Sequence, residues 1–329
     1  MQNINIGLLG YGFIGQVHSL ACRSLPFLYQ PFPYRLNPVA VTAASERSRD
    51  LALRQGGFAY AAPDWRAVVE DPQVTVVDCC LPNNLHYEPV MAALRAGKHV
   101  YCEKPLALNL AEARALATAG EESGLCHQVV FHQRFFPAIM RAKQLIDEGF
   151  LGRTFHFRVS YLHAGYVDPR RPVSWRLDKA ASGGGALFDL GAHSVDLILY
   201  LLGEIEAVNA TLETFIRERP SAADPDRLVP VEVDDIVLAR LRMRNGAVGT
   251  LEVSRLATGT NDDETLAVYG SDGAIVFHLM EPDWLYVYDG RDAPAPIGGM
   301  RGFRRLETVQ RYPAPAVHAL GKLPVGWLR

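Results

Sequence analysis

An apolar stretch in the second half of the chain carries two titratable side chains at helical spacing. Asp189 and His193 are four residues apart, so on a helix they share one face, with Asp196 nearby on it. Burying a carboxylate and an imidazole costs free energy unless the two are paired or used. A histidine beside a carboxylate titrates near neutral pH and suits a general base. Glycines 183–185 would let a backbone or a ligand approach the start of this helix closely.

Two other interpretations of the same segment stay open. Asp189 could cap the helix beside a core histidine that is satisfied by its neighbours. Asp189, His193 and Asp196 could instead hold a metal ion, but the sequence nearby offers no further cluster of histidine or cysteine. We therefore predict no metal site.

A lysine follows a predicted strand in the first half of the chain. The run Tyr101-Cys102-Glu103-Lys104-Pro105 ends the strand His99–Cys102, and the carboxyl ends of parallel strands face the ligand crevice. A lysine there can hold a substrate hydroxyl and stabilise the alkoxide that precedes hydride loss. The alternative is an ordinary solvated surface lysine.

Three glycines follow the first predicted strand and open a helix. Gly10 permits a tight turn, Gly12 lets a pyrophosphate approach the backbone, and Gly15 lets the helix pack on the strand. The amides and the positive end of the helix dipole then attract the phosphates. At the start of a βαβ pattern, this motif predicts a dinucleotide cofactor. Its members are Gly10, Tyr11, Gly12, Phe13, Ile14 and Gly15.

The end of the second strand selects between NAD and NADP. An acidic residue there binds the adenosine ribose of NAD, whereas an arginine suits the 2′-phosphate of NADP. Positions 43 and 44 are alanines, with Ser45 and Arg47 just beyond, so the sequence favours NADP over NAD. The alternative is that Glu46 turns in to the ribose while Arg47 stays solvated.

Strands and helices alternate in the first third of the chain, which predicts a parallel sheet wrapped on both faces. Residues 26–38 hold four prolines and are expected to form a loop. Asn109 and Gly124 are the expected cap and stop of the helix Leu110–Ser123. The other predicted helices run to about Ser24 and over Glu88–Ala96; the predicted strands are Asn3–Leu9, Val39–Ala43, Val74–Cys80, His99–Cys102 and Cys126–Phe131.

From about residue 150 the pattern changes to strands with few helices, namely Ala138–Glu148 and Leu187–Leu202. The pairs Met243/Ala247 and Tyr269/Ala274 predict hairpins and hence antiparallel pairing. We expect a dinucleotide-binding domain over 1–129, a mostly antiparallel domain over 130–329, and an irregular tail after Gly298. The predicted strands are Thr154–His163, Ala207–Ile216, Asp235–Met243, Ala247–Ser254, Thr265–Tyr269, Ala274–His278 and Trp284–Tyr288.

Composition excludes several classes of protein. With 49% hydrophobic residues in 329, the chain can bury a core, so long disorder is excluded. A net charge of −3 argues against nucleic-acid binding, and no run of about 18 apolar residues predicts a membrane span. The first residues lack the pattern of a signal peptide. Five cysteines without disulfide or zinc spacing suggest free thiols in the cytoplasm.

Several motifs, in this order along the chain, resemble the Gfo/Idh/MocA family of oxidoreductases. The match runs from the first strand to about residue 200, and its most specific parts are Glu-Lys-Pro and the glycine-rich Asp/His helix. The motifs are Gly10–Gly15 with His18, Leu81–His86, Glu103-Lys104-Pro105, Phe131–Pro137, Trp175-Arg176 and Gly183–Asp196.

The resemblance implies an N-terminal Rossmann domain and a C-terminal α/β domain on a large, mostly antiparallel sheet, often used for oligomerisation. We therefore expect a homodimer or homotetramer. It implies that Lys104, Asp189 and His193 form the catalytic set: His193 as acid/base, Lys104 polarising the hydroxyl, and Asp189 holding substrate or histidine. Further residues are implied near cofactor or substrate: Leu81, Pro82, Asn83, His86, Glu103, Arg134, Tyr161, His163, Trp175 and Arg176.

These features predict an NAD(P)-dependent dehydrogenase or reductase acting on a secondary alcohol of a sugar, cyclitol or related polyol. Three departures from the family pattern bear on it: the missing acidic ribose-binding residue, the insert at 26–38, and an end at Arg329 where relatives add a helical segment. One alternative is a family member that retains its cofactor and cleaves glycosides. Another is a nucleotide-binding sensor or regulatory protein without turnover; ordinary sheet-face packing is the alternative for Tyr161 and His163.

Overall fold

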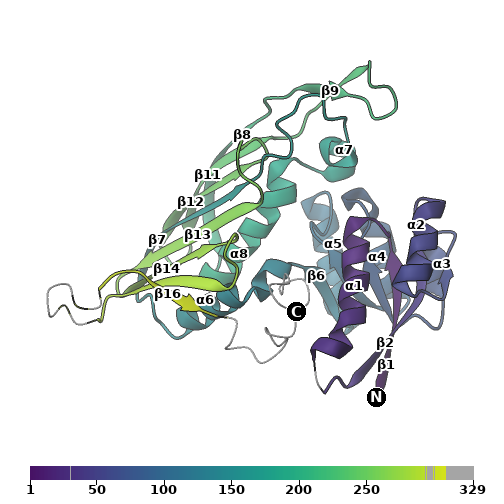
Figure 1. Cartoon of the computed structure of the whole chain (residues 1–329), viewed down its shortest axis with the longest axis horizontal. Coiled ribbons are helices and arrows are strands. Elements are labelled where there is room, and N and C mark those ends of the chain that lie inside the picture. Colours follow the sequence, from purple (N-terminus) through teal and green to yellow (C-terminus); the bar gives the residue numbers. More distant parts are fainter. Residues whose placement is uncertain (30, 293, 295–298, 300, 309–329) are drawn as a thin grey trace. The chain divides into compact units, whose positions relative to one another are not determined.

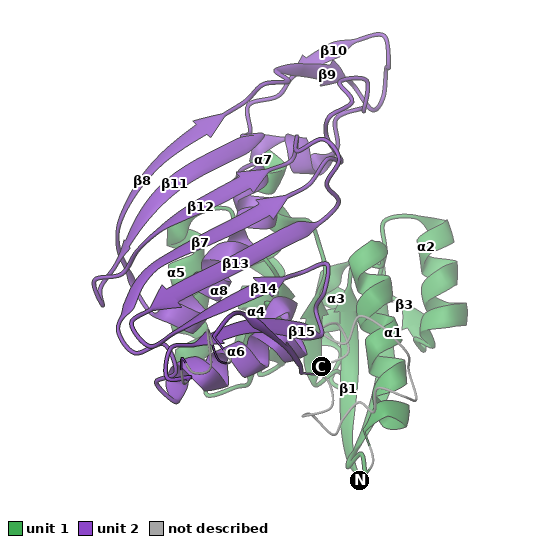
Figure 2. Ribbon diagram, turned by 60° about the vertical axis from the view of Figure 1, so that its left-hand side comes forward, with its two compact units in different colours: residues 1–131, 180–183, 328 green, residues 132–179, 184–327, 329 purple. Residues whose placement is uncertain are grey.

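The computed structural model describes residues 1–29, 31–292, 294, 299 and 301–308, and they form two compact units. The first unit is Met1–Phe131 with Ala180–Gly183, and the second is His132–Lys179 with the described residues from Gly184 onward (Figure 2). The division into domains 1–129 and 130–329 stays a prediction. The grouping of Ala180–Gly183 with the first unit was not foreseen from the sequence.

The first unit is built on a sheet of six strands among the described residues, in the order β3-β2-β1-β4-β5-β6, and every pairing is parallel. Figure 1 labels β1, β2 and β6 of this sheet. The predicted doubly wound parallel sheet is thus confirmed. Its strands are β1 Gln2–Leu9, β2 Tyr34–Thr42, β3 Tyr60–Ala61, β4 Val76–Cys79, β5 His99–Glu103 and β6 His127–Val130. Its helices are α1 Phe13–Leu28, α2 Glu46–Leu51, η1 Ala52–Gly56, α3 Trp65–Glu70, η2 Asn83–Leu85, α4 Tyr87–Arg95 and α5 Leu110–Ser123.

Local capping explains why α5 was predicted with its observed bounds. The Asn109 side chain accepts a hydrogen bond from the Glu112 amide at the start, and Gly124 ends the helix at a φ of 65°. Asparagine is a favoured N-cap because its oxygen satisfies an amide that has no partner within the helix. Glycine is favoured after the last turn because it adopts positive φ without strain.

The prediction of a loop over residues 26–38 is wrong for residues 26–28 and 34–38, which are helix and strand. Helix α1 continues to Leu28 with Pro26 inside it, and strand β2 begins at Tyr34. Pro38 lies within β2, where the pairing with β1 shifts register: Ile6 faces Pro38 and Gly7 faces Ala40. A proline lacks the amide that a sheet needs, and a register shift accommodates that loss.

The second unit is built on a sheet of eight strands among its described residues, in the order β16-β15-β14-β13-β7-β12-β11-β8. β7 pairs in parallel with β12 and antiparallel with β13, and all other pairs are antiparallel. The Tyr269/Ala274 hairpin pair is confirmed. The strands are β7 Thr154–Leu162, β8 Ile205–Glu213, β11 Ile236–Met243, β12 Val248–Ser254, β13 Asp263–Gly270, β14 Gly273–His278, β15 Trp284–Asp289 and β16 Arg304–Glu307.

The sequence missed several short elements here. Strand β16 lies in the stretch after Gly298 that was expected to be irregular, and the remainder of that stretch from residue 309 lies outside the described residues. The helices of the unit are η3 His132–Phe135, α6 Pro137–Asp147, η4 Trp175–Leu177, α7 Lys179–Ser182, η5 Leu187–Gly191 and α8 Ala192–Leu202. A separate pair of strands is β9 Glu218–Pro220 with β10 Leu228–Pro230. Only Lys179 of α7 groups with this unit.

The core of the second unit lies between one face of the large sheet and the helices α6 and α8. Leu197, Ile198, Phe157 and Phe277 are fully buried there. Among the described residues, one helical segment, Lys179–Leu202, is apolar and long enough to cross a membrane by composition alone, and 61% of its most apolar window is buried inside the structure. Packing against a sheet accounts for such an apolar helix.

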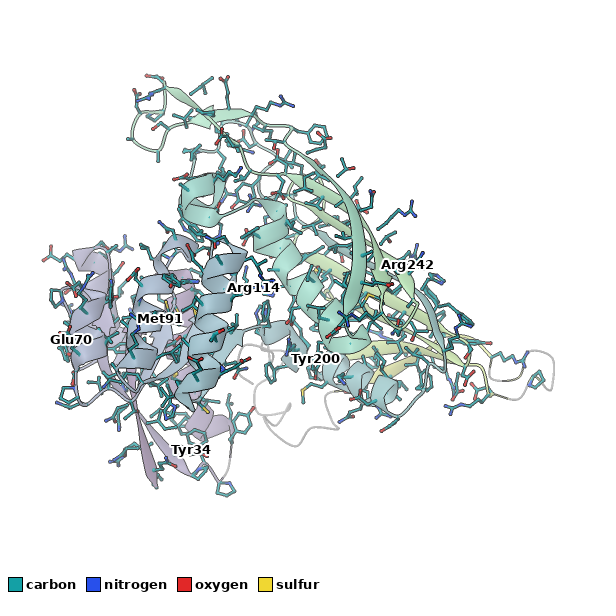
Figure 3. The ribbon with its side chains drawn as sticks, turned by 180° about the vertical axis from the view of Figure 1, so that it is seen from behind. Tyr34, Glu70, Met91, Arg114, Tyr200 and Arg242 are labelled. Carbon is teal, nitrogen blue, oxygen red and sulfur yellow. The ribbon has the colours of Figure 1, made fainter. Side chains whose placement is uncertain are left out.

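The opposite face of the sheet is exposed. Tyr200 of α8 and Arg242 of β11, labelled in Figure 3, belong to the two sides of this sheet. A hollow of about 540 Å³ lies on the exposed face, lined by residues of β7, β8, β11 and β12 that include Arg158, Arg240 and Arg242. None of the predicted catalytic residues lines it.

Candidate functional site

The glycine turn after β1 has the geometry that a dinucleotide needs. Gly10 has a φ of 92°, and a Cβ at Gly15 would lie 2.1 Å from the Gly10 carbonyl oxygen, so both positions require glycine. A Cβ at Gly12 would meet nothing within 4 Å among the described residues. Gly12 precedes the first residue of α1 without a side-chain cap. The open space beside uncapped helix amides fits a pyrophosphate. Phe13 is exposed and Ile14 half-buried.

The two residues predicted at the adenosine end differ in what they do. The Ser45 hydroxyl caps the short helix α2, where it accepts the Ser48 amide hydrogen at 3.1 Å. Arg47 is exposed on the first turn of α2. The capping bond gives Ser45 a structural role, so Arg47 is the better candidate for contact with a 2′-phosphate.

The turn after β4 is held by a buried histidine. His86 is fully buried, and its two ring nitrogens lie 2.8 Å from the Leu81 carbonyl oxygen and 3.0 Å from that of Pro105. Burial lowers the pKa of His86. Because both nitrogens face backbone carbonyls, His86 ties the turn after β4 to the turn after β5. Its place along the nicotinamide half of the cofactor stays a prediction.

The neighbouring residues of this turn lie in different environments. The buried side chain of Asn83 donates to the Ser182 carbonyl oxygen at 2.8 Å, a contact within the first unit. Leu81 and Pro82 are half-buried. Of the residues predicted here for the cofactor, these two present more surface than Asn83 and His86.

A buried network lies directly behind Lys104. His18 Nδ1 lies 3.0 Å from both oxygens of Asp78, and its Nε2 lies 3.2 Å from Glu103 Oε1. The other oxygen of Glu103 accepts the backbone amide hydrogen of Lys104 at 3.0 Å. Glu103 is therefore engaged inside the unit, and its place beside the nicotinamide stays a prediction. Lys104 is half-buried at the carboxyl end of β5, as predicted.

Opposing effects set the charge of His18. Burial disfavours the imidazolium, but the two carboxylates outweigh it and raise the pKa of His18 to about 10. His18 is thus a cation that joins α1, β4 and the end of β5. The sequence placed His18 in the resemblance without a role, because its partners are distant along the chain.

Two groups of His, Cys and Asp in the first unit bring possible ligand atoms within 4.8 Å of one another. They are Cys79, His86 and Cys102, and His18, Asp78 and Cys80. Each histidine is already hydrogen-bonded, to backbone carbonyls or to carboxylates. Hydrogen bonding accounts for both arrangements.

The predicted helix Leu187–Leu202 is confirmed, with a π-helical first turn. That turn, η5, carries Asp189, and α8 carries His193. Asp234 caps the start: its carboxylate accepts the amide hydrogens of Gly185 and Leu187, each at 2.8 Å. A Cβ at Gly185 would lie 1.9 Å from the Asp234 carbonyl oxygen, so this glycine serves the close backbone approach predicted for it.

Asp189 is held between two arginines. Arg255 Nη2 lies 3.3 Å from Asp189 Oδ2, and Arg176 Nε lies 3.8 Å from Oδ1. The Arg176 guanidinium also lies 4.4 Å from the Trp175 ring centroid. The structure therefore brings together three predicted site residues, Asp189, Trp175 and Arg176. Arg255 was missed, because the sequence places it at the end of a strand with no motif around it.

His193 is buried beside two other rings. The ring of His132 lies 5.1 Å away in an edge-on arrangement, and that of Tyr161 lies 6.3 Å away. Burial raises the pKa of Tyr161, so its phenol stays protonated. Tyr161 thus lies next to the predicted acid/base residue, whereas the role of His132 was not predicted.

Two other predicted substrate residues have partners within the unit. Arg134 forms a two-pronged ion pair with Asp196, one bond of which measures 2.7 Å, and its guanidinium lies over the Tyr200 ring. This pair accounts for the acidic group that shares a face with His193. His163 Nδ1 accepts the Gly165 amide hydrogen at 2.8 Å, and Nε2 lies 3.7 Å from Asp262.

A buried acid lies beneath this part of α8. Glu264 of β13 is fully buried and accepts a hydrogen bond of 2.6 Å from the hydroxyl of Ser194, the residue after His193. Burial raises the pKa of Glu264 to about 8, against the effect of that hydrogen bond. This raised pKa was not predictable from the sequence, since a strand pattern does not show which glutamate faces the core.

Comparison with known proteins agrees with these features. The model of the oxidoreductase family Gfo/Idh/MocA, described by its NAD-binding Rossmann fold, matches residues 4–131, and the model of the family's C-terminal domain matches residues 139–276. Levoglucosan dehydrogenase of Pseudarthrobacter phenanthrenivorans is 40% identical over 95% of this chain and 82% of its own length. A solved structure of levoglucosan dehydrogenase in complex with NADH and L-sorbose superposes with a TM-score of 0.93 at 39% identity, covering 100% of this chain and 87% of that one.

A further relative uses the phosphorylated cofactor, as its name states. It is scyllo-inositol 2-dehydrogenase (NADP(+)) IolW of Bacillus subtilis, 32% identical over 64% of this chain and 55% of its own length. The motifs, the parallel sheet with its glycine turn, and both family models agree. This chain belongs to the Gfo/Idh/MocA family of NAD(P)-dependent oxidoreductases.

Proposed function

We propose that this chain oxidises a secondary alcohol of a sugar, cyclitol or related polyol, or reduces the corresponding ketone, with a nicotinamide cofactor. The observation that carries the proposal is the segment η5–α8. It is mostly apolar, yet it keeps a buried histidine and an ion-paired carboxylate one helical turn apart. The similarity to levoglucosan dehydrogenase makes anhydrosugars and sugars the first substrates to test.

The catalytic roles are assigned to three residues. His193 takes the proton of the reacting hydroxyl, and the rings of His132 and Tyr161 lie near its imidazole. The role proposed for Lys104, from the resemblance to the family, is to polarise the hydroxyl and stabilise its developing negative charge. Asp189 accepts a hydrogen bond from a substrate hydroxyl. A nicotinamide cofactor, when bound, would supply the hydride chemistry.

The cofactor would be held by the first unit. The amides after Gly12 would bind the pyrophosphate, and Leu81 and Pro82 would border the nicotinamide half. The choice of NADP over NAD stays a prediction based on Arg47 and on the alanines before it. Relatives with either cofactor exist: the solved structure of levoglucosan dehydrogenase contains NADH, and the inositol dehydrogenase of Bacillus subtilis is named for NADP.

Two further proposals concern the setting of the enzyme. We place the reaction in the cytoplasm, in keeping with five free cysteines. We also propose that two copies associate through the exposed face of the eight-stranded sheet, because that face carries exposed apolar side chains beside arginines. We propose no nucleic acid, membrane or metal as a partner.

The test is absorbance of the reduced nicotinamide with a panel of sugars, anhydrosugars and cyclitols, offered with NAD and NADP separately. We expect Lys104→Met and His193→Ala each to lower turnover by about two orders of magnitude. Lys143→Met, which removes a surface charge paired with Asp147, is the matched control and should retain activity. Near-normal rates in both site variants would remove the assignment.

Two other outcomes of the same assay identify other functions. Sugar released from a glycoside without net cofactor reduction would identify a retained-cofactor glycoside-cleaving enzyme. Tight cofactor binding without turnover of any substrate would identify a sensor.

A further inference from the structure

Arg255 is a buried arginine at the end of β12 whose side chain is 1% exposed. One of its nitrogens, Nη2, donates to the Gly185 carbonyl oxygen at 3.0 Å and to Asp189 Oδ2 at 3.3 Å. The other, Nη1, donates to the Arg176 carbonyl oxygen at 3.5 Å. The guanidinium also lies 4.8 Å from the centroid of the Tyr166 ring.

These contacts join three separate pieces of the candidate site. The Asp189 carboxylate, the glycine turn before η5 and the segment Trp175-Arg176 all meet the same planar group. The fork of an arginine fixes direction as well as distance, because its donors are held in one plane. The backbone of Gly185 is held at both of its polar groups. Its amide donates to Asp234, and its carbonyl oxygen accepts from Arg255.

A second buried arginine in the same unit, Arg219, provides a comparison, because among the described residues it bonds only to the backbone. Arg219 is also fully buried, and its two terminal nitrogens donate to the backbone carbonyls of Asp168 and Tyr166. Both of these hydrogen bonds thus serve the backbone. Arg255 differs, because one of its donors reaches a carboxylate that is partly open to solvent, with 23% of the Asp189 side chain exposed.

We propose that Arg255 is a positioning residue that orients Asp189 for the substrate and holds the Trp175-Arg176 segment beside it. This inference rests on the proposed function, in which Asp189 binds a substrate hydroxyl. Arg255 acts through Asp189, since a carboxylate anchored at Oδ2 by a charge-assisted bond cannot rotate freely. Arg255 lies behind the carboxylate and supplies no proton.

The experiment is a double-mutant cycle on the full-length chain, with Arg255→Met, Asp189→Ala and the pair, assayed with the best sugar of the panel. We expect Arg255→Met to lower kcat/KM for the sugar by about 10- to 100-fold, which matches the loss of one charged hydrogen bond. The KM for the cofactor should stay within about twofold. In the Asp189→Ala background, Arg255→Met should lower kcat/KM by less than a further factor of about two, because the carboxylate that Arg255 anchors has been removed.

The matched control is Arg219→Met. It also removes a buried guanidinium and should lower the melting temperature, yet leave kcat/KM within about twofold of the starting enzyme. Arg255→Lys keeps the charge without the fork, and we expect it to recover part of kcat/KM. Should Arg255→Met fail to fold, Arg255→Lys carries the same cycle.

Three outcomes overturn the proposal. Equal losses from the Arg255 substitution in both backgrounds would show that it only supports the fold. Unchanged kcat/KM in folded Arg255→Met would show that Asp189 needs no anchor. A wild-type chain that oxidises no sugar with either cofactor overturns the proposed function, and this inference with it.

Discussion

The three glycines of the first turn differ in why they are glycine. A methyl group at Gly15 would collide with the Gly10 carbonyl at 2.1 Å, whereas one at Gly12 would point into open space. We expect Gly12→Ala to fold with a melting temperature near that of the wild type and to raise the KM for the cofactor about tenfold or more, because the methyl group occupies the place of the pyrophosphate. Thermal melts and cofactor titrations measure the two effects.

The companion variant Gly15→Ala should instead lose stability. If Gly12→Ala bound the cofactor as tightly as the wild type, this turn would not hold a pyrophosphate. A strong loss of folding in Gly12→Ala would contradict the open space found beside it.

Site residues that belong to a local sequence motif could be predicted from the sequence. Residues whose partners are distant along the chain could not. Gly10, Lys104, Asp189 and His193 stand in recognisable spacings. Arg255 has no such spacing, since its partner Asp189 lies far away along the chain and meets it only when the sheet forms. For the same reason the sequence could not show that both nitrogens of His86 face backbone carbonyls.

At the scale of elements, the contact between α8 and β13 contains a buried acid. The pKa of Glu264 is raised from 4.5 to about 8, so the folded chain keeps a proton that the unfolded chain releases. The stability that this proton carries is fully present below pH 4.5 and is lost as the pH rises to about 8. His18, with its pKa raised from 6.5 to about 10, acts in the same direction at higher pH.

We expect Glu264→Gln to remove the Glu264 part of this dependence. Relative to the variant, the wild type should lose unfolding free energy on the order of a few kcal/mol between pH 5 and 8. Urea unfolding at several pH values measures it. Glu122→Gln, at an exposed position of α5, is the control and should parallel the wild type. Identical slopes for wild type and Glu264→Gln would show that Glu264 ionises normally.

Elements were predicted well where their ends carry their own signals. Helix α5 has an asparagine cap and a glycine stop, and the β13–β14 hairpin has its turn residues. Helix α1 and strand β2 were misjudged because proline was taken to exclude both. In the folded unit, Pro26 is tolerated near the end of α1 and Pro38 at a register shift. Tertiary packing overrode a local preference at both places.

At the scale of the whole molecule, the exposed face of the large sheet predicts association. Leu238 of β11 and Val248 of β12 are 53% and 44% exposed there. We expect a wild-type dimer or tetramer, and a smaller species when both residues are changed to aspartate, because charges would be buried at the contact. Light scattering on a sizing column measures the mass. Leu110→Asp, at an exposed position of α5, is the control.

A wild-type chain that runs as a monomer at micromolar concentration would contradict this proposal. So would a double variant that keeps the mass of the wild type.

The fold class of both units followed from alternation and hairpin signals alone. The grouping of Ala180–Gly183 with the first unit did not, since a short glycine-rich segment carries no periodicity to assign it.

The position of β7 in its sheet affects how the chain can be synthesised. β7 lies in the middle, but both neighbours, β12 and β13, come much later in the sequence. While the ribosome is still translating, β7 therefore has two bare edges that other nascent chains could pair with. A premature stop between Ser254 and Asp263 would leave one edge uncovered for good, and such fragments should precipitate or be degraded.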